Sequence, residues 1–316
     1  MFIVSSLFAA IIPMLIYLYF IWKMDKYEPE PIKFVMLHFL WGAFGAVFLG
    51  ASGSTILGIF SNLIFHFSPT LIETTSISSV LFAPISEEFA KGLFIIFSSR
   101  SKYFDNSTDG IVYGAAIGLG FGMTENFLYF TSYGDNFSSW IYLVIIRSFF
   151  SAVMHAISTG IFGSFMGIAK YLNSILRLPL ISFAMIISIS IHSLWNFSVS
   201  SSDTYVFGFL SMIFLISIFI QTLKYSAKRD KKIIHDEIKE EIENNFIPFQ
   251  VIDFVNNSIE TDNKNPIRKK ILSLIVHLAF SKMKYKKTKG KAKENYYNEI
   301  LYYRNSINNL FETNLQ

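Results

Sequence analysis

The chain has 316 residues, of which 52% are hydrophobic and only 16% are charged, whereas a typical soluble domain has about 25% charged residues. It contains no cysteine, which excludes disulfides, thiolate nucleophiles and cysteine-ligated metals. The formal net charge is only +4, and apart from this charge nothing in the sequence is typical of nucleic-acid recognition. The composition therefore predicts an integral membrane protein.

Seven transmembrane helices are predicted, because several apolar stretches reach the roughly 20 residues that are needed to cross a bilayer. In chain order they cover residues 2–22, 34–60, 75–98, 111–130, 139–169, 178–199 and 205–223. The first stretch lacks the basic start and the small-residue cleavage site of a signal peptide, so we expect it to be retained. The predicted fold class is an all-α polytopic membrane helix bundle, with a membrane domain over residues 1–223.

The short loops between these stretches predict the orientation of the chain. Lys or Arg occur in the loops 23–33, 99–110 and 170–177 and directly after residue 223, whereas the alternate loops contain neither. Because basic loops stay on the cytoplasmic side, we expect the N-terminus outside and the C-terminus in the cytoplasm.

The fourth predicted span contains Gly110, Gly114 and Gly118 at a spacing of four residues. Small residues at this spacing let membrane helices approach each other closely. We expect close helix packing there and infer no catalytic role from these glycines.

The last part of the chain, residues 224–316, differs in composition from the rest. It has 18 Lys and Arg against 12 Asp and Glu, whereas residues 1–223 have 9 against 11. Isoleucines at helical spacing over 233–242 predict one helix, and the stretch 269–283 predicts another that is too short to cross a membrane. We expect a basic, helical cytoplasmic tail, either as a small helical domain or as helices at the membrane surface.

Polar side chains are concentrated in four consecutive predicted spans. A charge at the centre of a membrane helix costs about 2.5–3.5 kcal/mol on insertion scales, so such residues indicate function. The side chains are Glu87, Glu88, Lys91, Glu125, Asn126, Arg147, His155, His192 and Asn196. We expect the three glutamates, the two histidines and Asn196 at similar depth, from the middle to the outer half of the bilayer, which predicts one buried polar site.

Helical spacing relates several of these side chains to one another. Glu87 and Glu88 precede Lys91 by four and three residues, so the lysine can neutralise either carboxylate. The two carboxylates project about 100° apart, so one can face a cavity while the other supports it. His192 and Asn196 are four residues apart and share a helix face.

These residue types suit the activation of water. A glutamate can take a proton from water, a histidine can orient the water, and Asn or His donors can stabilise an oxyanion. Two histidines and a glutamate could also bind Zn²⁺, although the pattern HExxH is absent and the histidines lie on different predicted helices. The candidate metal ligands are Glu87, Glu125, His155 and His192.

Two other functions fit the same residues. A proton-coupled transporter could use Glu87, Glu88 and Lys91 as a proton relay, but the sequence shows no internal repeat of the kind that many transporters have. A catalytically silent binding protein is the third alternative, and the complete set of polar residues argues against it.

Four motifs, in this order along the chain, resemble the PrsW family of intramembrane proteases. "EEFAK" (87–91) is similar to the family's EExxK motif, and "FGMTEN" (121–126) is similar to its FxxxE motif. His155 follows on the next predicted span, and "HSLWN" (192–196) follows on the one after. The ordered set on successive helices is specific, and the resemblance covers about residues 75–200.

The motifs also resemble those of the CAAX-processing and bacteriocin-immunity proteases. That clan has EExxxR and FxxxH motifs, from which this sequence departs at Lys91 and Glu125. Both departures favour the PrsW branch.

The resemblance implies an integral membrane endopeptidase of a bacterial inner membrane, whose partners are a membrane-anchored substrate protein and the lipid bilayer, without nucleic acid. In the family's founding member the substrate is an anti-sigma factor, cut on its extracytoplasmic side. The family is catalogued as metalloprotease, whereas the clan's mechanism is argued to use glutamate without metal. The expected cofactor is therefore none or zinc.

The resemblance also assigns roles to the residues. Glu87 would activate water together with a histidine. Helical spacing adds that Glu88 would support it by pairing with Lys91, or that the two glutamates would exchange these roles. His192 and Asn196 would form the oxyanion site. Glu125 and His155 complete the expected catalytic set, and Arg147 is expected to support it.

Overall fold

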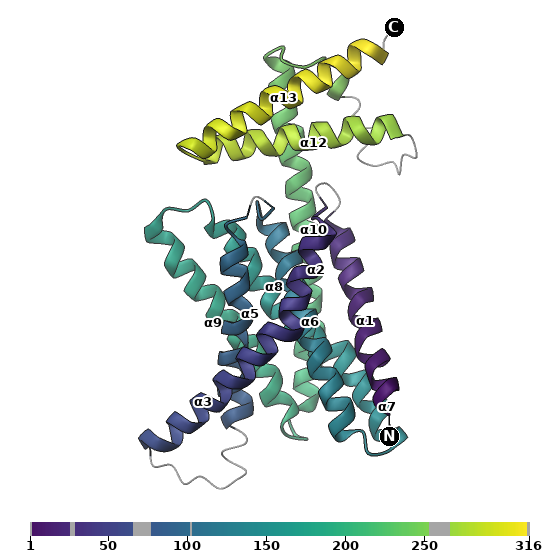
Figure 1. Ribbon diagram of the computed structural model, residues 1–316, viewed down its shortest axis with the longest axis vertical. Helices are drawn as coiled ribbons and strands as arrows, with labels where there is room; N and C mark the ends of the chain where they lie inside the picture. The colour runs from purple at the N-terminus through teal and green to yellow at the C-terminus, as the bar shows by residue number, and fades with distance from the viewer. Residues whose placement is uncertain (1, 26–28, 66–76, 102, 253–265, 315–316) are drawn as a thin grey trace. The chain divides into compact units, whose positions relative to one another are not determined.

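A computed structural model of the chain describes residues 2–25, 29–65, 77–101, 103–252 and 266–314, which form helices and their connections without any strand (Figure 1). The chain divides into two compact units. The membrane unit comprises Met1–Asp25 and Glu30–Leu223, and the tail unit comprises Lys26–Pro29 and Lys224–Gln316.

The membrane unit is a bundle of helices in which π-helical turns (η) interrupt or precede the α-helices. Its elements are α1 (Ile3–Met24), α2 (Ile32–Leu40), η1 (Trp41–Ala46), α3 (Val47–Phe65), η2 (Ser78–Phe82), α5 (Ala83–Ser98), α6 (Ser107–Tyr133), α7 (Phe137–Ile146), η3 (Arg147–Ser151), α8 (Ala152–Ala169), α9 (Ser174–Val199) and the first part of α10 (Tyr205–Glu243). Such π-turns are rare and frequently lie at functional sites.

Within the described residues, five helical stretches are long and apolar enough to cross a membrane. They are Ile3–Met24, Ile32–Ser61, Phe137–Ala169, Ser174–Val199 and Tyr205–Glu243. The predicted spans 75–98 and 111–130 correspond to η2 with α5 and to α6, except that residues 75 and 76 lie outside the described residues. The predicted all-α membrane bundle is confirmed, and the number of crossings stays a prediction.

Helix α6 lies inside the bundle and packs against α8 through its glycines. A Cβ atom on Gly114 would overlap the carbonyl oxygen of Thr159, and one on Gly118 would overlap that of His155. The two backbones are therefore in direct contact, as the spacing of small residues predicts. This contact fixes His155 next to the segment of α6 that leads to Glu125.

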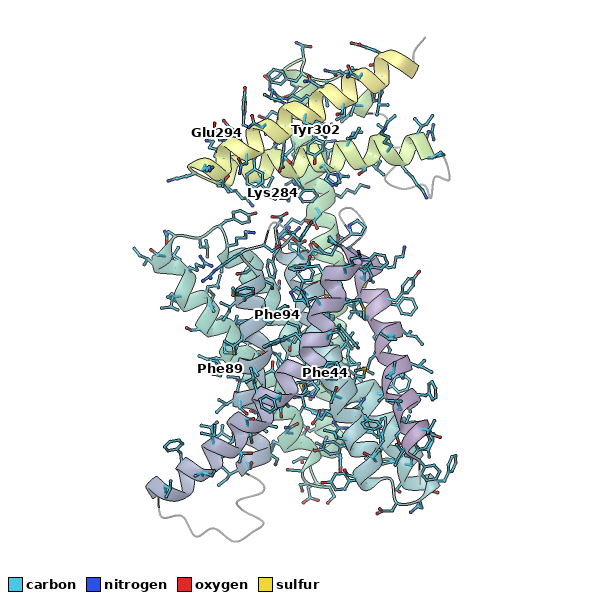
Figure 2. The ribbon with its side chains drawn as sticks, in the orientation of Figure 1. Phe44, Phe89, Phe94, Lys284, Glu294 and Tyr302 are labelled. Carbon is cyan, nitrogen blue, oxygen red and sulfur yellow. The ribbon has the colours of Figure 1, made fainter. Side chains whose placement is uncertain are left out.

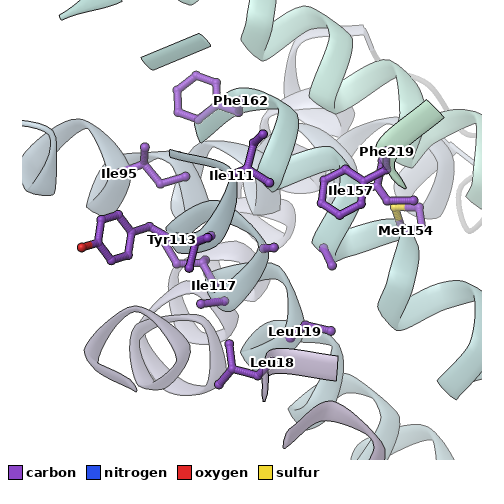
Figure 3. Close-up of a cluster of buried hydrophobic side chains, with 14 of the residues drawn as sticks. Leu18, Ile95, Ile111, Tyr113, Ile117, Leu119, Met154, Ile157, Phe162 and Phe219 are labelled. Atoms are coloured by element: carbon purple, nitrogen blue, oxygen red, sulfur yellow. The ribbon is translucent and has the colours of Figure 1, made fainter. Parts of the chain in front are cut away.

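The core of the membrane unit consists of apolar side chains from several helices. Leu18, Ile95, Ile117, Phe162 and Phe219 lie in it and are buried (Figure 3). Large apolar side chains also cover the outside of the unit, as Figure 2 shows for Phe44 and Phe89 on η1 and α5. An apolar outside is expected of helices that face lipid.

The tail unit has an apolar core of its own. It contains the rest of α10 together with α12 (Pro266–Lys287) and α13 (Lys291–Asn314). Apolar side chains at helical spacing on each helix meet in this core, among them Ile234, Ile275 and Ile307. Helix α10 continues without a break from the predicted last span into the tail, to Glu243.

Candidate active site

Glu88, on α5, is the most fully bonded carboxylate of the membrane unit's polar cluster. Its side chain is buried, and its Oε1 atom accepts hydrogen bonds from Lys91 Nζ at 2.8 Å and from His192 Nδ1 at 2.9 Å. Its Oε2 atom accepts hydrogen bonds from the hydroxyls of Ser158, Thr159 and Ser188. A buried carboxylate needs such donors, and these come from α5, α8 and α9.

Lys91 lies one turn after Glu88 and is completely buried. Besides Glu88, its Nζ atom contacts His155 Nδ1 at 2.9 Å and lies 3.9 Å from the centre of the Phe121 ring. Its distance to Glu87 Oε2 is 3.8 Å. The ammonium group therefore lies at the centre of the cluster, between two carboxylates, a histidine and an aromatic face.

Glu87 differs from Glu88 because one of its carboxylate oxygens accepts no hydrogen bond from the described residues. Its side chain is 15% exposed, yet its Oε2 atom is buried and has no hydrogen-bond partner among the described residues. This oxygen lies 3.7 Å from His192 Nε2. Helix α3 packs closely behind the side chain, since a Cβ on Gly50 would lie 2.9 Å from Glu87 Cγ.

Glu125, on α6, forms the other side of the cluster with two residues of the next membrane segment. Its Oε2 atom lies 2.7 Å from His155 Nε2 and 2.8 Å from Arg147 Nη2. Arg147 begins the π-turn η3, donates a hydrogen bond from Nε to Asn126 Oδ1 at 3.1 Å, and stacks 3.6 Å above the ring of Tyr129. These contacts hold the guanidinium group in one orientation.

The hydrogen bonds determine how the two histidines carry their protons. Because the carboxylate of Glu88 accepts, His192 carries its proton on Nδ1 and turns the lone pair of Nε2 towards Glu87. Because the ammonium of Lys91 donates to Nδ1, His155 carries its proton on Nε2 and donates it to Glu125. His192 Nε2 and Glu87 Oε2 are therefore two acceptors that face each other.

The structure brings together most of the residues that the sequence analysis selected. Glu87, Glu88, Lys91, Glu125, Arg147, His155 and His192 form one connected cluster. Asn196 is one turn beyond His192, and its amide donates a hydrogen bond to the main-chain oxygen of Ser79 at 2.8 Å. This bond uses one of the two N–H groups of the amide, so the other can donate to an oxyanion.

Three hydroxyl donors to Glu88 are missing from the predicted site. Ser158 lies three residues after His155, and Ser188 lies four residues before His192. This spacing places each serine on the same face as its histidine, so the spacing was the signal that could have identified them. Thr159 carries no comparable signal.

Glu87, His155 and His192 have the residue types of a catalytic zinc site, with one potential ligand atom from each within 4.8 Å of the others. Such a site takes three protein ligands. Both ring nitrogens of His155, however, are hydrogen-bonded, one to Lys91 and one to Glu125. As arranged here, this set offers only two free ligand atoms and does not fit a three-ligand metal.

Comparison with known proteins gives consistent results. Residues 30–222 match the family model described as PrsW family intramembrane metalloprotease. The chain is similar to the Protease PrsW of Geobacillus kaustophilus, with 28% identity over 53% of this chain and 68% of that protein. It is also similar to those of Bacillus subtilis, with 25% identity over 66% and 88% of the two chains, and Clostridioides difficile, with 32% identity over 60% and 76%. No solved structure matches the chain.

Proposed function

The chain belongs to the PrsW family of intramembrane proteases, and we propose that it hydrolyses a peptide bond of a membrane-anchored protein with a water molecule that Glu87 activates. Its family membership makes it a peptidase that acts on membrane proteins. Each relative reported above is named a protease, which leaves the transporter alternative without support.

The observation that carries this proposal is the pair of acceptors formed by Glu87 Oε2 and His192 Nε2. They are 3.7 Å apart, too far for a direct hydrogen bond. A water molecule at about 2.8 Å from each atom would satisfy both. Its two hydrogens would then point at the protein, and an oxygen lone pair would point towards a substrate carbonyl.

The reaction follows from this arrangement. Glu87 accepts a proton from the water while the water oxygen bonds to the carbonyl carbon. It then donates that proton to the amide nitrogen as the carbon–nitrogen bond breaks. His192 orients the water, and Glu88 with Lys91 holds His192 in the required tautomer. Of the two assignments that the sequence left open, this geometry supports Glu87 as the base.

We assign the stabilisation of the oxyanion to Arg147. Its side chain is 12% exposed. Its Nη2 atom forms an ion pair with Glu125 but no hydrogen bond, so its N–H groups can donate to a substrate oxygen. His192 Nε2 acts as an acceptor here, whereas Asn196 keeps a second amide N–H beside the one bonded to Ser79 and can add a donor. A positive group fixed before the reaction stabilises charge as it develops on the substrate.

The expected substrate is a protein with a single membrane span, cut near its extracytoplasmic end. This proposal combines the predicted orientation, N-terminus outside and C-terminus in the cytoplasm of a bacterial inner membrane, with the outer-half depth expected for Glu125 and His192. An anti-sigma factor or a similar regulator is the substrate class that the family suggests.

Labelling of new protein N-termini tests this proposal. Bacterial membranes containing the wild type, Glu87→Gln or Glu294→Gln are compared, the last being a control at an exposed tail position. We expect new N-termini at the end of a membrane span with the wild type and the control, and none with Glu87→Gln. If Glu87→Gln yields the same N-termini as the wild type, the proposal is wrong.

A further inference from the structure

The ammonium group of Lys91 lies among the atoms that a divalent metal would need. It is 2.9 Å from His155 Nδ1 and 3.8 Å from Glu87 Oε2, and both residues belong to the cluster with the ligand types of a zinc site. Lys91 has no exposed surface. The ammonium therefore cannot move into solvent without a rearrangement of α5 and its neighbours.

His155 is the residue for which a metal and Lys91 would compete. A metal needs a nitrogen lone pair, and the lone pair on Nδ1 accepts the hydrogen bond from Lys91. The other nitrogen, Nε2, donates to Glu125, which Arg147 also holds. Freeing Nδ1 requires the removal of one lysine contact, whereas freeing Nε2 requires the disruption of the Glu125 pair as well.

We propose that Lys91 occupies the cation position of this cluster, so that its ammonium and a divalent metal exclude each other at His155. The remaining contacts of the ammonium support this role. It forms an ion pair with Glu88 at 2.8 Å and rests on the face of Phe121, an environment that favours a cation. A charge built into the chain thus fills the place that a bound ion would fill.

This inference concerns the same site as the proposed function, but its test needs no substrate. Lys91 and a metal can exclude each other at His155 even if the chain cleaves no substrate, and the chain can cleave a substrate even if they do not exclude each other. The two outcomes are therefore distinguishable.

Titration with Co²⁺ tests the inference, because tetrahedral Co²⁺ with nitrogen and oxygen ligands absorbs visible light. The full chain is purified in detergent as wild type, Lys91→Met and Lys170→Met. Lys170 is a control because its ammonium binds the main-chain oxygens of Ser101 and Phe104, away from the cluster. We expect Lys91→Met to bind Co²⁺ at least tenfold more tightly than the wild type, and Lys170→Met to behave like the wild type.

Two further variants make the result decisive. Adding His155→Ala to Lys91→Met should abolish the gain, because the freed nitrogen belongs to His155. Glu88→Gln combined with Lys91→Met removes both charges of the buried pair, and it replaces the single variant if that one does not fold. If the wild type binds Co²⁺ as tightly as the Lys91 variants, or if the gain survives without His155, the inference is wrong.

Discussion

The membrane unit and the tail unit each contain a buried glutamate that is paired with a lysine and with a second nitrogen donor. In the tail, Glu241 is 1% exposed and contacts Lys282 Nζ at 2.7 Å and Arg304 Nη2 at 2.8 Å. In the membrane unit, Glu88 is 2% exposed and contacts Lys91 Nζ at 2.8 Å and His192 Nδ1 at 2.9 Å. By burial and charge alone the two clusters look alike.

The two clusters differ in whether a carboxylate oxygen lacks a hydrogen-bond partner. The additional carboxylates of the tail cluster, Glu237 and Glu240, both accept hydrogen bonds from Lys286. The membrane cluster leaves Glu87 Oε2 without a hydrogen-bond partner in the described part of the chain. A closed cluster of charges holds helices together, whereas a cluster with one open acceptor can also take a proton from water.

The largest effect is expected from the open acceptor. Glu87→Gln keeps the shape of the side chain but removes the base, so proteolysis should fall by roughly 10²–10⁴-fold. The melting temperature in detergent should hardly change, because no hydrogen bond to Oε2 is lost. The measurement is the cleavage rate of a substrate identified by N-terminal labelling. A large loss of stability with little loss of rate would show that Glu87 is structural.

A mutation in the tail cluster around Glu241 should lower stability and leave proteolysis unchanged. Glu241→Ala leaves the buried Lys282 and the partly buried Arg304 without their main partner, and removing one member of a buried pair costs about 3–5 kcal/mol. Hydrogen exchange in the full chain should show faster opening of α12 and α13. The rate at which the membrane unit cleaves its substrate should not change. Glu243→Ala, at an exposed position of the same helix, is the matched control. Normal protection in Glu241→Ala would contradict this expectation.

Close helix packing should matter less than the buried charges but still measurably. A Cβ at Gly118 would overlap the His155 carbonyl, so Gly118→Ala should separate α6 from α8 and destabilise the membrane unit by about 1–3 kcal/mol. A Cβ at Gly58 would meet nothing within 4 Å, so Gly58→Ala should be neutral. Thermal unfolding in detergent compares the two variants. Equal melting temperatures would mean that α8 can move away from α6 without a loss of stability.

The sequence predicted the parts of the site that depend on helical spacing. The pairing of Lys91 with the adjacent carboxylates, and the shared face of His192 and Asn196, follow from 3.6 residues per turn. The glycines at 110, 114 and 118 predicted the close contact of α6 with another helix, and the structure shows that this helix is α8. Family membership and fold class were likewise predictable, because apolar length and ordered motifs both lie in the sequence.

Contacts between helices could not be predicted in the same way. Which carboxylate meets His192, and which one meets Arg147, depends on how α5, α6 and α9 are rotated about their axes. The π-turns change this rotation, and hydrophobic periodicity does not reveal them. The bond of Asn196 to Ser79 depends on one such turn, η2. The occupied nitrogens of His155 are therefore a result that only the structure provides.

A third buried carboxyl group, Glu30, sharpens the comparison because a proton replaces the cation. It lies in the connection between α1 and α2, outside the membrane-spanning helices. Burial, and then the charge of Asp109, raise its pKa from 4.5 to about 12, against the opposing hydrogen bond from Tyr113. Among the described residues no cation is paired with Glu30, so this carboxyl group should stay protonated at neutral pH in the folded chain.

The smallest expected effect is the pH dependence that follows from this proton. The pKa of Glu30 is higher in the folded chain than in the unfolded chain. The contribution of its proton to the stability of the fold is therefore complete below about pH 4.5 and declines as the pH rises towards the folded pKa. One extra bound proton corresponds to about 1.4 kcal/mol per pH unit, so the wild type should be less stable at pH 7 than at pH 6 by about that amount. Glu30→Gln mimics the protonated form and should remove this slope, while the exposed control Glu294→Gln should keep it. Equal slopes in Glu30→Gln and the wild type, from thermal unfolding in detergent, would mean that Glu30 is ionised and that a cation must accompany it there as well.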